Sequence, residues 1–504
     1  MHINTKQLIL SLSICLLSWS LFSQNFSYTF DQIPESNESG KGMFVSEESA
    51  IYVNAGMVCQ ELTQSCSMTY KFDNNGNLLW NTLIDTINSL NWETIQVEND
   101  SIYIGMANFT ASPNDYLSQA VFEDNTGEIL RIFNSQYDSP EEITLSPFGQ
   151  LIIDDKIYAF GSGWNHIESF NSPGYIHVMD KEGNYLHHLE YRQDNFNSIF
   201  QLMEGPSEDL YFLCASGNSL GLDNFWLVSW NPITDETEVV VHLPFQSFVR
   251  PFYTILSEQF VMTKHEYDFA GALPPHFALE GYSHTGDLQW LFVYERGFFS
   301  DDIGSYDILE ITTCANDDFL ISGEYDDGES NEFGFILRFN NLGELLWERR
   351  YKAYDDFGGL RDCSLSALRE MPDGSIVAIG SMQQVSEFGA EEDFWILKVD
   401  ENGCYREGEE CDDLTVSQWI TSTEDKYSEE EVIVFPNPVK DKLNIEAETL
   451  ISNTTIYTID GRLLSTQYHQ SGDISIQIDD LPSGIYYLEI KTNDGDVMKK
   501  FIKL

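Results

Sequence analysis

Short apolar runs alternate with polar turns along most of this chain, a pattern that predicts many short β-strands rather than helices. One unit recurs between residues 70 and 405: an apolar strand, a turn of Asp or Asn followed by Gly, and a second strand. It occurs first as Tyr70–Trp80 and returns in similar form as Leu337–Trp347. Because Asn, Asp and Gly tolerate the positive φ of tight turns, each unit predicts a β-hairpin.

The spacing of these hairpins indicates seven repeats. The turn glycines are Gly76, Gly127, Gly183, Gly286, Gly343 and Gly403. Their separation is between 51 and 60 residues except for one step of 103, which spans two periods. The degenerate unit Val228–Val239 lies inside that long step and supplies the missing repeat.

Each repeat contains about four strands. A strand that often ends at Gly precedes the hairpin, as in Ile157–Gly161, Phe319–Gly323 and Ile376–Gly380, and a further strand precedes that one. Four strands in about fifty residues predict the blade of a β-propeller. Seven blades stacked around an axis cover both faces of every sheet, with glycine suited to close packing near the narrow centre. The alternative, an open solenoid, would need polar end caps that the sequence does not show.

The first strand of the propeller region has no partner within its own repeat. Phe26–Asp31 is similar to the outer strands Trp80–Asp85 and Trp347–Tyr351. The last repeat ends in a weak strand, Cys404–Glu407. We therefore expect Phe26–Asp31 to complete or extend the seventh blade and so to close the ring.

The N-terminal residues 1–23 predict a signal peptide. Lys6 precedes the apolar segment Leu8–Leu17, which is too short to span a bilayer as a stable helix. We place cleavage near Ser23–Gln24; an uncleaved anchor is the alternative, disfavoured by the single positive charge. We expect no transmembrane segment in the mature chain.

Seven cysteines follow the predicted signal peptide, and export permits disulfides. Cys59 and Cys66 flank a short turn, and Cys404 and Cys411 bracket six residues at the end of the propeller region. Both pairings agree with the spacing, but the spacing does not require them. The odd count leaves at least one free thiol, for which we expect Cys214, a small apolar residue in a strand-like run.

The charge balance narrows the range of partners. The chain has 82 Asp and Glu against 26 Lys and Arg, a net charge of −56. Such a surface repels nucleic acid and anionic lipid, so we expect no nucleic-acid partner. The acidic residues are scattered rather than spaced as in metal-binding loops, which indicates a solvated surface. We expect no cofactor.

A separate domain follows an acidic linker. Residues 412–431 are polar, and about seventy residues of alternating strands after them predict a small β-sandwich. Three motifs and a basic, apolar end occur there in order: Phe435-Pro436-Asn437-Pro438-Val439, Asp460-Gly461-Arg462, Leu481-Pro482-Ser483-Gly484-Ile485-Tyr486-Tyr487-Leu488 and Lys499–Leu504. Each motif alone occurs in ordinary sandwiches, and a generic fibronectin-like module is the alternative.

Together these motifs resemble the type A sorting domain of type IX secretion substrates. The resemblance implies that Pro436, Asn437, Pro438, Gly461, Pro482, Gly484 and Tyr486 form the sorting motif. It also implies contact with the type IX secretion machinery, and release from or attachment to the outer surface of a Gram-negative bacterium. The sorting domain of this family is usually removed. The sequence thus predicts an all-β protein: signal peptide 1–23, seven-bladed β-propeller 24–411, acidic linker 412–431 and sorting sandwich 432–504.

Candidate chemistry is sparse. His187 and His188 lack a zinc-binding spacing, and no nucleophile elbow or phosphate-binding glycine loop is present. The pairs Asp301-Asp302 and Asp355-Asp356 occur at equivalent repeat positions, which favours turns over calcium binding or glycosidase chemistry. Two functions remain open: a non-catalytic module that binds a glycan or a protein, which we favour, and a secreted hydrolase or lyase acting on polysaccharide. Asp, Glu, Tyr and Trp side chains clustered around the central funnel would favour the enzyme.

Overall fold

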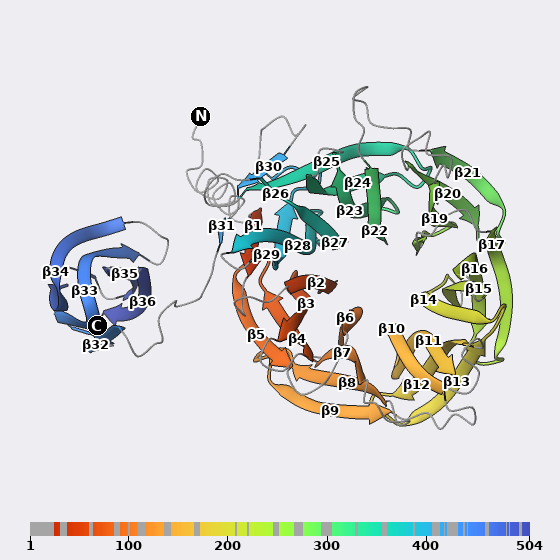
Figure 1. Cartoon of the computed structure of the whole chain (residues 1–504), viewed down its shortest axis with the longest axis horizontal. Coiled ribbons are helices and arrows are strands. Elements are labelled where there is room, and N and C mark those ends of the chain that lie inside the picture. The colour runs from red at the N-terminus through yellow and green to blue at the C-terminus, as the bar shows by residue number, and fades with distance from the viewer. Residues whose placement is uncertain are drawn as a thin grey trace, which may run out of the picture. The chain divides into compact units, whose positions relative to one another are not determined.

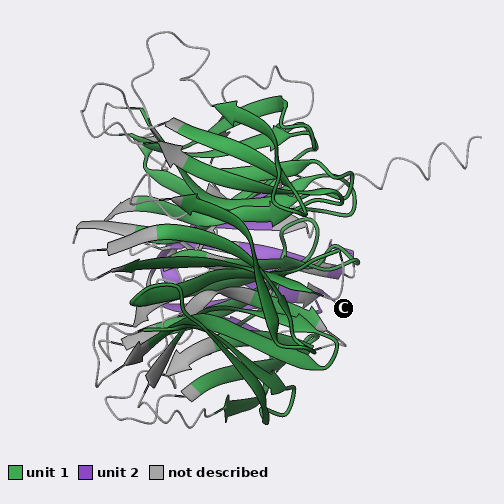
Figure 2. Cartoon of the chain, turned by 90° about the vertical axis from the view of Figure 1, so that its right-hand side faces the viewer, with its two compact units in different colours: residues 1–420 green, residues 421–504 purple. Residues whose placement is uncertain are grey.

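The computed structural model consists of strands and turns in the part of the chain that it describes, with no helix that could span a membrane there. The chain forms two compact units, Met1–Ile420 and Thr421–Leu504, because most residue contacts fall within one unit or the other (Figure 2). The described residues are 25–30, 38–59, 64–84, 91–98, 101–108, 116–135, 143–165, 172–206, 209–218, 221–244, 251–266, 276–293, 305–327, 331–354, 360–386, 389–405, 414–417, 419–420, 432–436, 439–440, 442–458, 463–479, 481–482, 484–492 and 496–503. The predicted signal peptide and the two aspartate pairs lie outside these residues.

The first unit is a ring of seven antiparallel sheets, as the repeat predicts (Figure 1). Blade 1 contains β2 (Glu38–Val45), β3 (Ile51–Cys59), β4 (Gln64–Phe72) and β5 (Leu78–Ile84), and blade 2 contains β6 (Asn91–Glu98), β7 (Ser101–Asn108), β8 (Tyr116–Glu123) and β9 (Ile129–Ser135). Blade 3 contains β10 (Ile143–Ile153), β11 (Lys156–Asn165), β12 (Gly174–Asp180) and β13 (Tyr185–Tyr191), and blade 4 contains β14 (Phe196–Glu204), β15 (Leu210–Asn218), β16 (Gly221–Asn231) and β17 (Glu236–Pro244). Blade 5 contains β18 (Tyr253–Ile255), β19 (Gln259–Glu266), β20 (His276–Ser283) and β21 (Leu288–Val293), and blade 6 contains β22 (Ser305–Thr313), β23 (Phe319–Asp326), β24 (Glu332–Phe339), β25 (Leu345–Tyr354) and the short β26 (Leu360–Arg361).

Blade 7 joins the two ends of the propeller region. It contains β27 (Cys363–Glu370), β28 (Ile376–Ser386) and β29 (Gly389–Val399), and its fourth strand is β1 (Phe26–Phe30), antiparallel to β29. The indole of Trp395 donates a hydrogen bond to Ser27 Oγ at 2.9 Å. This pairing confirms that the N-terminal strand closes the ring.

The weak strand predicted at Cys404–Glu407 is wrong for its two described residues. Cys404 and Tyr405 lie in the turn and bend that follow β29, because β1 already occupies the strand edge that this segment would have needed. The side-chain amide of Asn25 instead donates hydrogen bonds to the carbonyl oxygens of Cys404 and Tyr405, at 3.1 and 3.2 Å.

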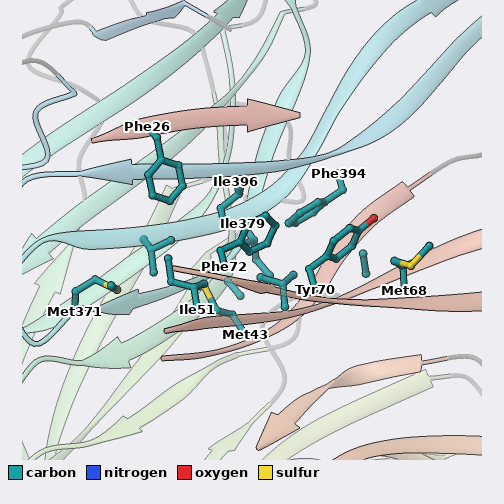
Figure 3. Close-up of a cluster of buried hydrophobic side chains, with 14 of the residues drawn as sticks. Phe26, Met43, Ile51, Met68, Tyr70, Phe72, Met371, Ile379, Phe394 and Ile396 are labelled. Atoms are coloured by element: carbon teal, nitrogen blue, oxygen red, sulfur yellow. The ribbon is translucent and has the colours of Figure 1, made fainter. Parts of the chain in front are cut away.

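The hydrophobic core of the described ring lies between the blades. Seven clusters of buried apolar side chains correspond to the seven pairs of adjacent blades. The cluster at the closing seam joins Phe26 and Phe394 of blade 7 to Met43, Tyr70 and their neighbours in blade 1 (Figure 3). The rings of Tyr70 and Phe394 stack with their centroids 5.2 Å apart. Each fully buried aromatic side chain contributes about 1.5–3 kcal/mol, so these seams supply most of the ring's stability.

The hairpin turns repeat the same local chemistry. All six glycines predicted at turns have positive φ, and Asp235 has this conformation in the degenerate fourth repeat. In blade 1 the carboxylate of Asp73 accepts hydrogen bonds from the backbone amides of Asn75 and Asn77, at 2.8 and 2.9 Å. This Asx-type bonding explains why Asp or Asn opens the turn.

Each turn also packs against the outer strand of the preceding blade. A Cβ placed on Gly127 would lie 2.5 Å from the ring of Trp80, and one on Gly343 would lie 2.5 Å from the ring of Trp290. At the closing seam the corresponding contact is 2.7 Å between Gly76 and the ring of Phe26. Phe26 therefore occupies in β1 the place that tryptophan occupies in other blades.

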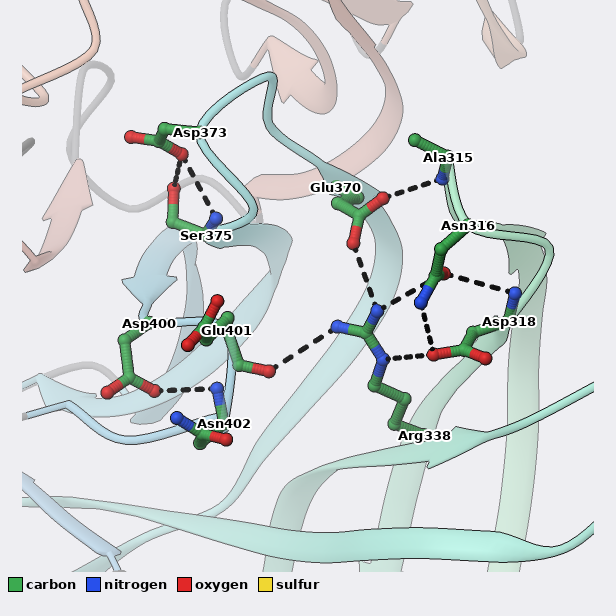
Figure 4. Close-up of polar contacts among 10 residues, drawn as sticks. All are labelled: Ala315, Asn316, Asp318, Arg338, Glu370, Asp373, Ser375, Asp400, Glu401 and Asn402. Carbon is green, nitrogen blue, oxygen red and sulfur yellow. Dashed lines mark hydrogen bonds and ion pairs between the residues drawn. The ribbon is translucent and has the colours of Figure 1, made fainter.

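Cationic side chains connect neighbouring turns. Lys398, which is fully buried, donates from Nζ to the Asn74 carbonyl at 2.9 Å and so reaches from blade 7 to the turn of blade 1. Arg338 of blade 6 reaches the Glu401 carbonyl in the turn of blade 7 at 3.4 Å, and it forms ion pairs with Asp318 and Glu370 at 3.1 and 3.2 Å (Figure 4). These contacts give Lys398 and Arg338 a structural role between neighbouring blades.

The innermost strands carry a bulge. The strand register shifts in β2, β10, β14, β22 and β27. Opposite three of these bulges, a Cβ on Gly161, Gly323 or Gly380 would lie 1.9–2.0 Å from a backbone oxygen of the innermost strand. Glycine at this position therefore permits the close approach near the centre that the sequence predicts.

The second unit is a small β-sandwich built from five strands, β32 (Val432–Phe435), β33 (Lys442–Thr458), β34 (Leu463–Gln477), β35 (Gly484–Thr492) and β36 (Asp496–Lys503). The longest strand is β33, whose register shifts between Glu446 and Ile451. Leu443, Ile456, Leu488 and Phe501 belong to its core. Within the range predicted as linker, β30 (Leu414–Ser417) pairs with β25 and β31 (Trp419–Ile420) pairs with β1, both in parallel.

Candidate functional site

The innermost strands surround a cavity of about 420 Å³ at the centre of the ring. Its lining comes from β2, β10, β14, β22 and β27, with Phe252 contributed from just before β18. Figure 1 shows these strands around the centre of the ring. The volume lies in the range of small-ligand sites, and six blades contribute to it, so this cavity is the candidate binding site.

The bulges direct side chains into the cavity. The extra residue of four of these bulges is Phe148 in β10, Phe200 in β14, Leu309 in β22 and Ser366 in β27, and all four line the cavity. A bulge changes the direction of a side chain that strand alternation would place between blades. The rings of Phe148 and Phe200 stack with centroids 5.0 Å apart. Sequence reasoning missed these residues, because a bulge interrupts the alternation on which strand prediction depends.

Polar side chains in the lining bond to the ring itself. Glu310 forms an ion pair with Arg369 at 2.6 Å and accepts the Leu368 amide hydrogen at 2.6 Å. Gln201 donates to the Tyr253 carbonyl and accepts from the Tyr253 amide, which links blades 4 and 5. Ser366 donates to the Gly40 carbonyl at 2.6 Å. The surface that these residues leave for a ligand is therefore mainly apolar.

The lining has few of the residues that would indicate catalysis. Its only carboxylates among the described residues are Glu204 and Glu310, and the part of the chain that the structure describes places no Asp, His, Tyr or Trp there. The aromatic residues of the lining are phenylalanines.

A separate group of carboxylates lies where blade 6 faces blade 7. Asp307 and Glu324 are direct cross-strand partners, as are Asp326 and Glu332. Residues two apart in a strand project from the same face, so all four carboxylates lie on the face of blade 6 that carries Leu320 against blade 7. Asp362 faces them from blade 7 and its carboxylate accepts the Glu332 amide hydrogen at 3.1 Å.

Burial and mutual repulsion change the acidity of this group. Burial, together with the charges of Glu332, Asp307, Asp326 and Asp362, raises the pKa of Glu324 to about 7. Burial also raises the pKa of Asp307 and of Glu332, with neighbouring carboxylates adding to both effects. Nevertheless, no three His, Cys, Asp or Glu residues in the described ranges are arranged to hold a metal ion.

The histidine pair has a structural environment. His187 Nε2 lies 3.1 Å from an Asp235 carboxylate oxygen in the turn of the next blade. His188 is largely buried, and its desolvation, with the nearby His177 and His187, lowers its pKa to about 3. The His188 ring is therefore neutral near pH 7, and it stacks on Tyr175 of the same blade with the ring centroids 6.0 Å apart.

The cysteines divide into two classes. Cys214, Cys314 and Cys363 are free and buried, which confirms the expectation for Cys214, and burial raises the pKa of the Cys214 thiol to about 12. Cys66 and Cys404 are disulfide-bonded. The side chains of Cys59 and Cys411 lie outside the described part of the chain, so the pairings Cys59–Cys66 and Cys404–Cys411 stay predictions.

The structure brings together part of the predicted sorting motif. The Tyr486 hydroxyl donates to the Pro482 carbonyl at 2.8 Å, and the Tyr486 ring stacks on Phe501 at 5.5 Å. Gly484 begins the strand β35 that carries Tyr486, and Pro436 directly follows β32. Asn437, Pro438 and Gly461 lie outside the described residues. The motif residues that can be placed fix one end of β35 in the sandwich core.

Comparisons with known proteins extend this picture. Residues 433–504 match the family model of the secretion system C-terminal sorting domain. No curated protein matches the chain. Among solved structures, an ulvan lyase from a polysaccharide lyase family has a TM-score of 0.43 and 10% identity, with 75% of this chain and 97% of that chain covered. A quinohemoprotein alcohol dehydrogenase from Comamonas testosteroni has a TM-score of 0.40 and 11% identity, with 77% of each chain covered.

A third solved structure is PorZ, a surface component of the type IX secretion system of Porphyromonas gingivalis, with a TM-score of 0.20, 9% identity, and 95% of this chain and 100% of that chain covered. Structural similarities of this size carry no argument about activity. The ring of blades and the family match of the last domain therefore characterise the molecule. Residues 433–504 are a secretion system C-terminal sorting domain, and the chain that carries them is a secreted or surface-attached β-propeller protein of a Gram-negative bacterium.

Proposed function

We propose that the propeller is a non-catalytic binding module and that its ligand is a protein rather than a glycan. The observation that carries this proposal is the lining of the axial cavity, in which Phe148, Phe200 and Phe252 provide the aromatic surface. Sugar rings present many hydroxyl groups, each of which needs a hydrogen-bond partner when it is buried. The polar side chains Gln201, Glu310 and Ser366 are already bonded to the ring, so an apolar protein side chain fits this lining better than a sugar.

The composition also argues against a glycosidase in the cavity. Hydrolysis of a glycosidic bond uses two carboxyl groups that flank the bond, one as acid and one as base or nucleophile. In the cavity one of the two carboxylates, Glu310, is held by Arg369 and by a backbone amide. A binding role does not require Glu310 to be available.

A polysaccharide hydrolase or lyase is the second candidate, and one observation favours it. Glu324, with its pKa raised to about 7, would be protonated at neutral pH in about half of the molecules and could act as a general acid. It has further carboxylates beside it, as such an enzyme requires. Structural carboxylate clusters perturb pKa values in the same way, so this site ranks below the binding role.

The two functions are separated by testing the full chain against immobilised surface proteins and a panel of polysaccharides. We expect saturable binding to a protein and no new reducing ends or unsaturated products from any polysaccharide. The Glu324→Gln variant serves as the control for chemistry, because it removes the only candidate acid with a strongly raised pKa among the described carboxylates. Polysaccharide cleavage by the wild type that this variant lacks would overturn the proposal in favour of the enzyme.

A further inference from the structure

The apolar part of the axial cavity's lining comes from several blades. Phe148, Phe200 and Leu309 are bulge residues of blades 3, 4 and 6, and Phe252 precedes the first strand of blade 5. All four are partly exposed, whereas apolar residues of the neighbouring strands, such as Phe212 and Phe260, are fully buried in the seams. Partly exposed apolar side chains that converge on a cavity are a binding surface rather than a core.

The bulges in β10, β14 and β22 place Phe148, Phe200 and Leu309 where the seams border the cavity. A strand that maintained its register would direct every second side chain toward a neighbouring blade. The extra residue in β10, β14 and β22 is in each case a large apolar one. The position is partly exposed, and contact with water favours polar side chains there. Phe148, Phe200 and Phe252 also pack against the seam clusters, so each of these side chains supports the ring with one part of its apolar surface and turns another part toward the cavity.

Charge restricts what this surface can accept. The chain has a net charge of −56, and the lining of the cavity includes the exposed side chain of Glu204. The one cationic side chain in the described lining, Arg369, is neutralised by Glu310. An anionic amphiphile such as a fatty acid would be repelled, whereas a positive charge beside an apolar group would be attracted.

We propose that the axial cavity binds an apolar side chain, aromatic or aliphatic, that projects from a lysine- or arginine-containing segment of a protein partner. This inference rests on the proposed binding function and specifies its ligand. The apolar side chain lies among Phe148, Phe200, Phe252 and Leu309, where desolvation favours it. The flanking positive charges face the carboxylate of Glu204. Anchors of this kind, a desolvated aromatic or aliphatic group with a charged surrounding, carry most of the energy at protein interfaces.

Three capped tripeptides test this proposal on the full chain: acetyl-Lys-Phe-Lys-amide, acetyl-Lys-Ala-Lys-amide and acetyl-Glu-Phe-Glu-amide. Binding is measured by isothermal titration calorimetry at low and at physiological salt. We expect saturable binding of the Lys-Phe-Lys peptide, at least tenfold weaker binding of the Lys-Ala-Lys peptide, and no binding of the Glu-Phe-Glu peptide. Affinity should fall as salt is added, because the charged part of the interaction is screened.

Two variants from different blades locate the site. Phe200→Ala and Leu309→Ala should each weaken binding of the Lys-Phe-Lys peptide about tenfold, and Glu204→Gln should weaken it severalfold. The matched control is Leu342→Ala, since Leu342 is a large apolar residue that is 66% exposed on the turn of blade 6. It should leave binding unchanged. Thermal melting of each variant confirms that the ring remains folded, and having two anchor variants keeps the test decisive if one of them does not fold.

Several results would overturn the inference. It fails if the Lys-Phe-Lys peptide shows no saturable binding, if both folded anchor variants bind it as the wild type does, or if the Glu-Phe-Glu peptide binds equally well. The proposed function is tested separately, by the experiment with immobilised surface proteins and polysaccharides. A protein partner that binds the wild type and the Phe200→Ala variant equally would leave the binding role intact and remove the cavity as its site.

Discussion

The seams between blades and the axial cavity are formed by neighbouring residues of the same strands, yet the two regions differ in how they repeat. At the seams, equivalent positions carry similar chemistry in most blades: a turn glycine faces a bulky ring, as Gly127 faces Trp80 and Gly343 faces Trp290. At the cavity, equivalent bulge positions carry different residues, with Phe200 in one blade and Ser366 in another. The residues that repeat from blade to blade hold the ring together, and the bulge residues that vary line the cavity.

The largest effect is expected where the ring closes. Deleting residues 24–31 removes β1, its pairing with β29, the buried Phe26 ring and the bond from Trp395 to Ser27. Lost apolar burial and lost strand hydrogen bonds together amount to about 5 kcal/mol or more. We expect the melting temperature of the whole propeller to fall, as measured by calorimetry.

The control for this deletion is Leu79→Ala, which changes a 54% exposed leucine on an outer strand and should leave the melt unchanged. A truncated chain that melted cooperatively at the temperature of the wild type would show that the closing strand does not stabilise the ring.

A pair of substitutions within blade 4 compares seam and cavity directly. Phe212 on β15 is fully buried in the seam between blades 3 and 4, and Phe200 on β14 lines the cavity. Phe212→Ala should cost about 3–5 kcal/mol of unfolding free energy, because it leaves a void in a packed core. Phe200→Ala should cost about 1 kcal/mol. Denaturant unfolding measures both, and equal losses would show that Phe200 belongs to the core.

The same contrast explains what the sequence could reveal. The turn glycines, the seven repeats and the closing role of Phe26–Asp31 were predictable because each follows from a pattern that recurs, so a single weak copy is recognised by its neighbours. The bulge residues were not predictable. Whether Phe148 faces a seam or the axis depends on one extra residue in the register of β10, which no local pattern marks.

Two other features depend on information outside their own segments. Leu414–Ser417 lies in an acidic stretch, and it forms β30 only because the outer edge of β25 is open to pair with it. The carboxylates of Asp307, Glu324 and Glu332 are separated in sequence, and only the strand register brings them onto one face. In contrast, the sorting domain was predictable because each of its short motifs is contiguous in the sequence, as in the stretch where Tyr486 contacts Pro482 within four positions.

An intermediate effect is expected at the turn glycines. Gly127→Ala combines a positive φ with a Cβ only 2.5 Å from the Trp80 ring, and it should destabilise the ring by about 2–4 kcal/mol. Gly374→Ala is the matched control, because Gly374 also has positive φ but the nearest atom to its Cβ would be 3.7 Å away. It should cost about 1 kcal/mol, measured by the same thermal unfolding. If the two losses were equal, contact between blades at the turn would have no part in the effect.

The smallest effect separates packing from charge at the seam between blades 6 and 7. The pKa of Glu324 is raised to about 7 in the folded chain from 4.5, so the folded state keeps a proton that the unfolded state releases between these values. The stability contribution of this proton is complete below pH 4.5 and is lost as pH rises through 7. Glu324→Gln resembles the protonated residue, and it should therefore leave stability unchanged at pH 4 and raise it by about 1 kcal/mol at pH 8, after allowance for solvent screening. Glu182→Gln, at an exposed turn of blade 3, should show no such pH-dependent difference in thermal unfolding. A stabilisation by Glu324→Gln that was the same at both pH values would assign the effect to packing rather than to the repulsion among carboxylates.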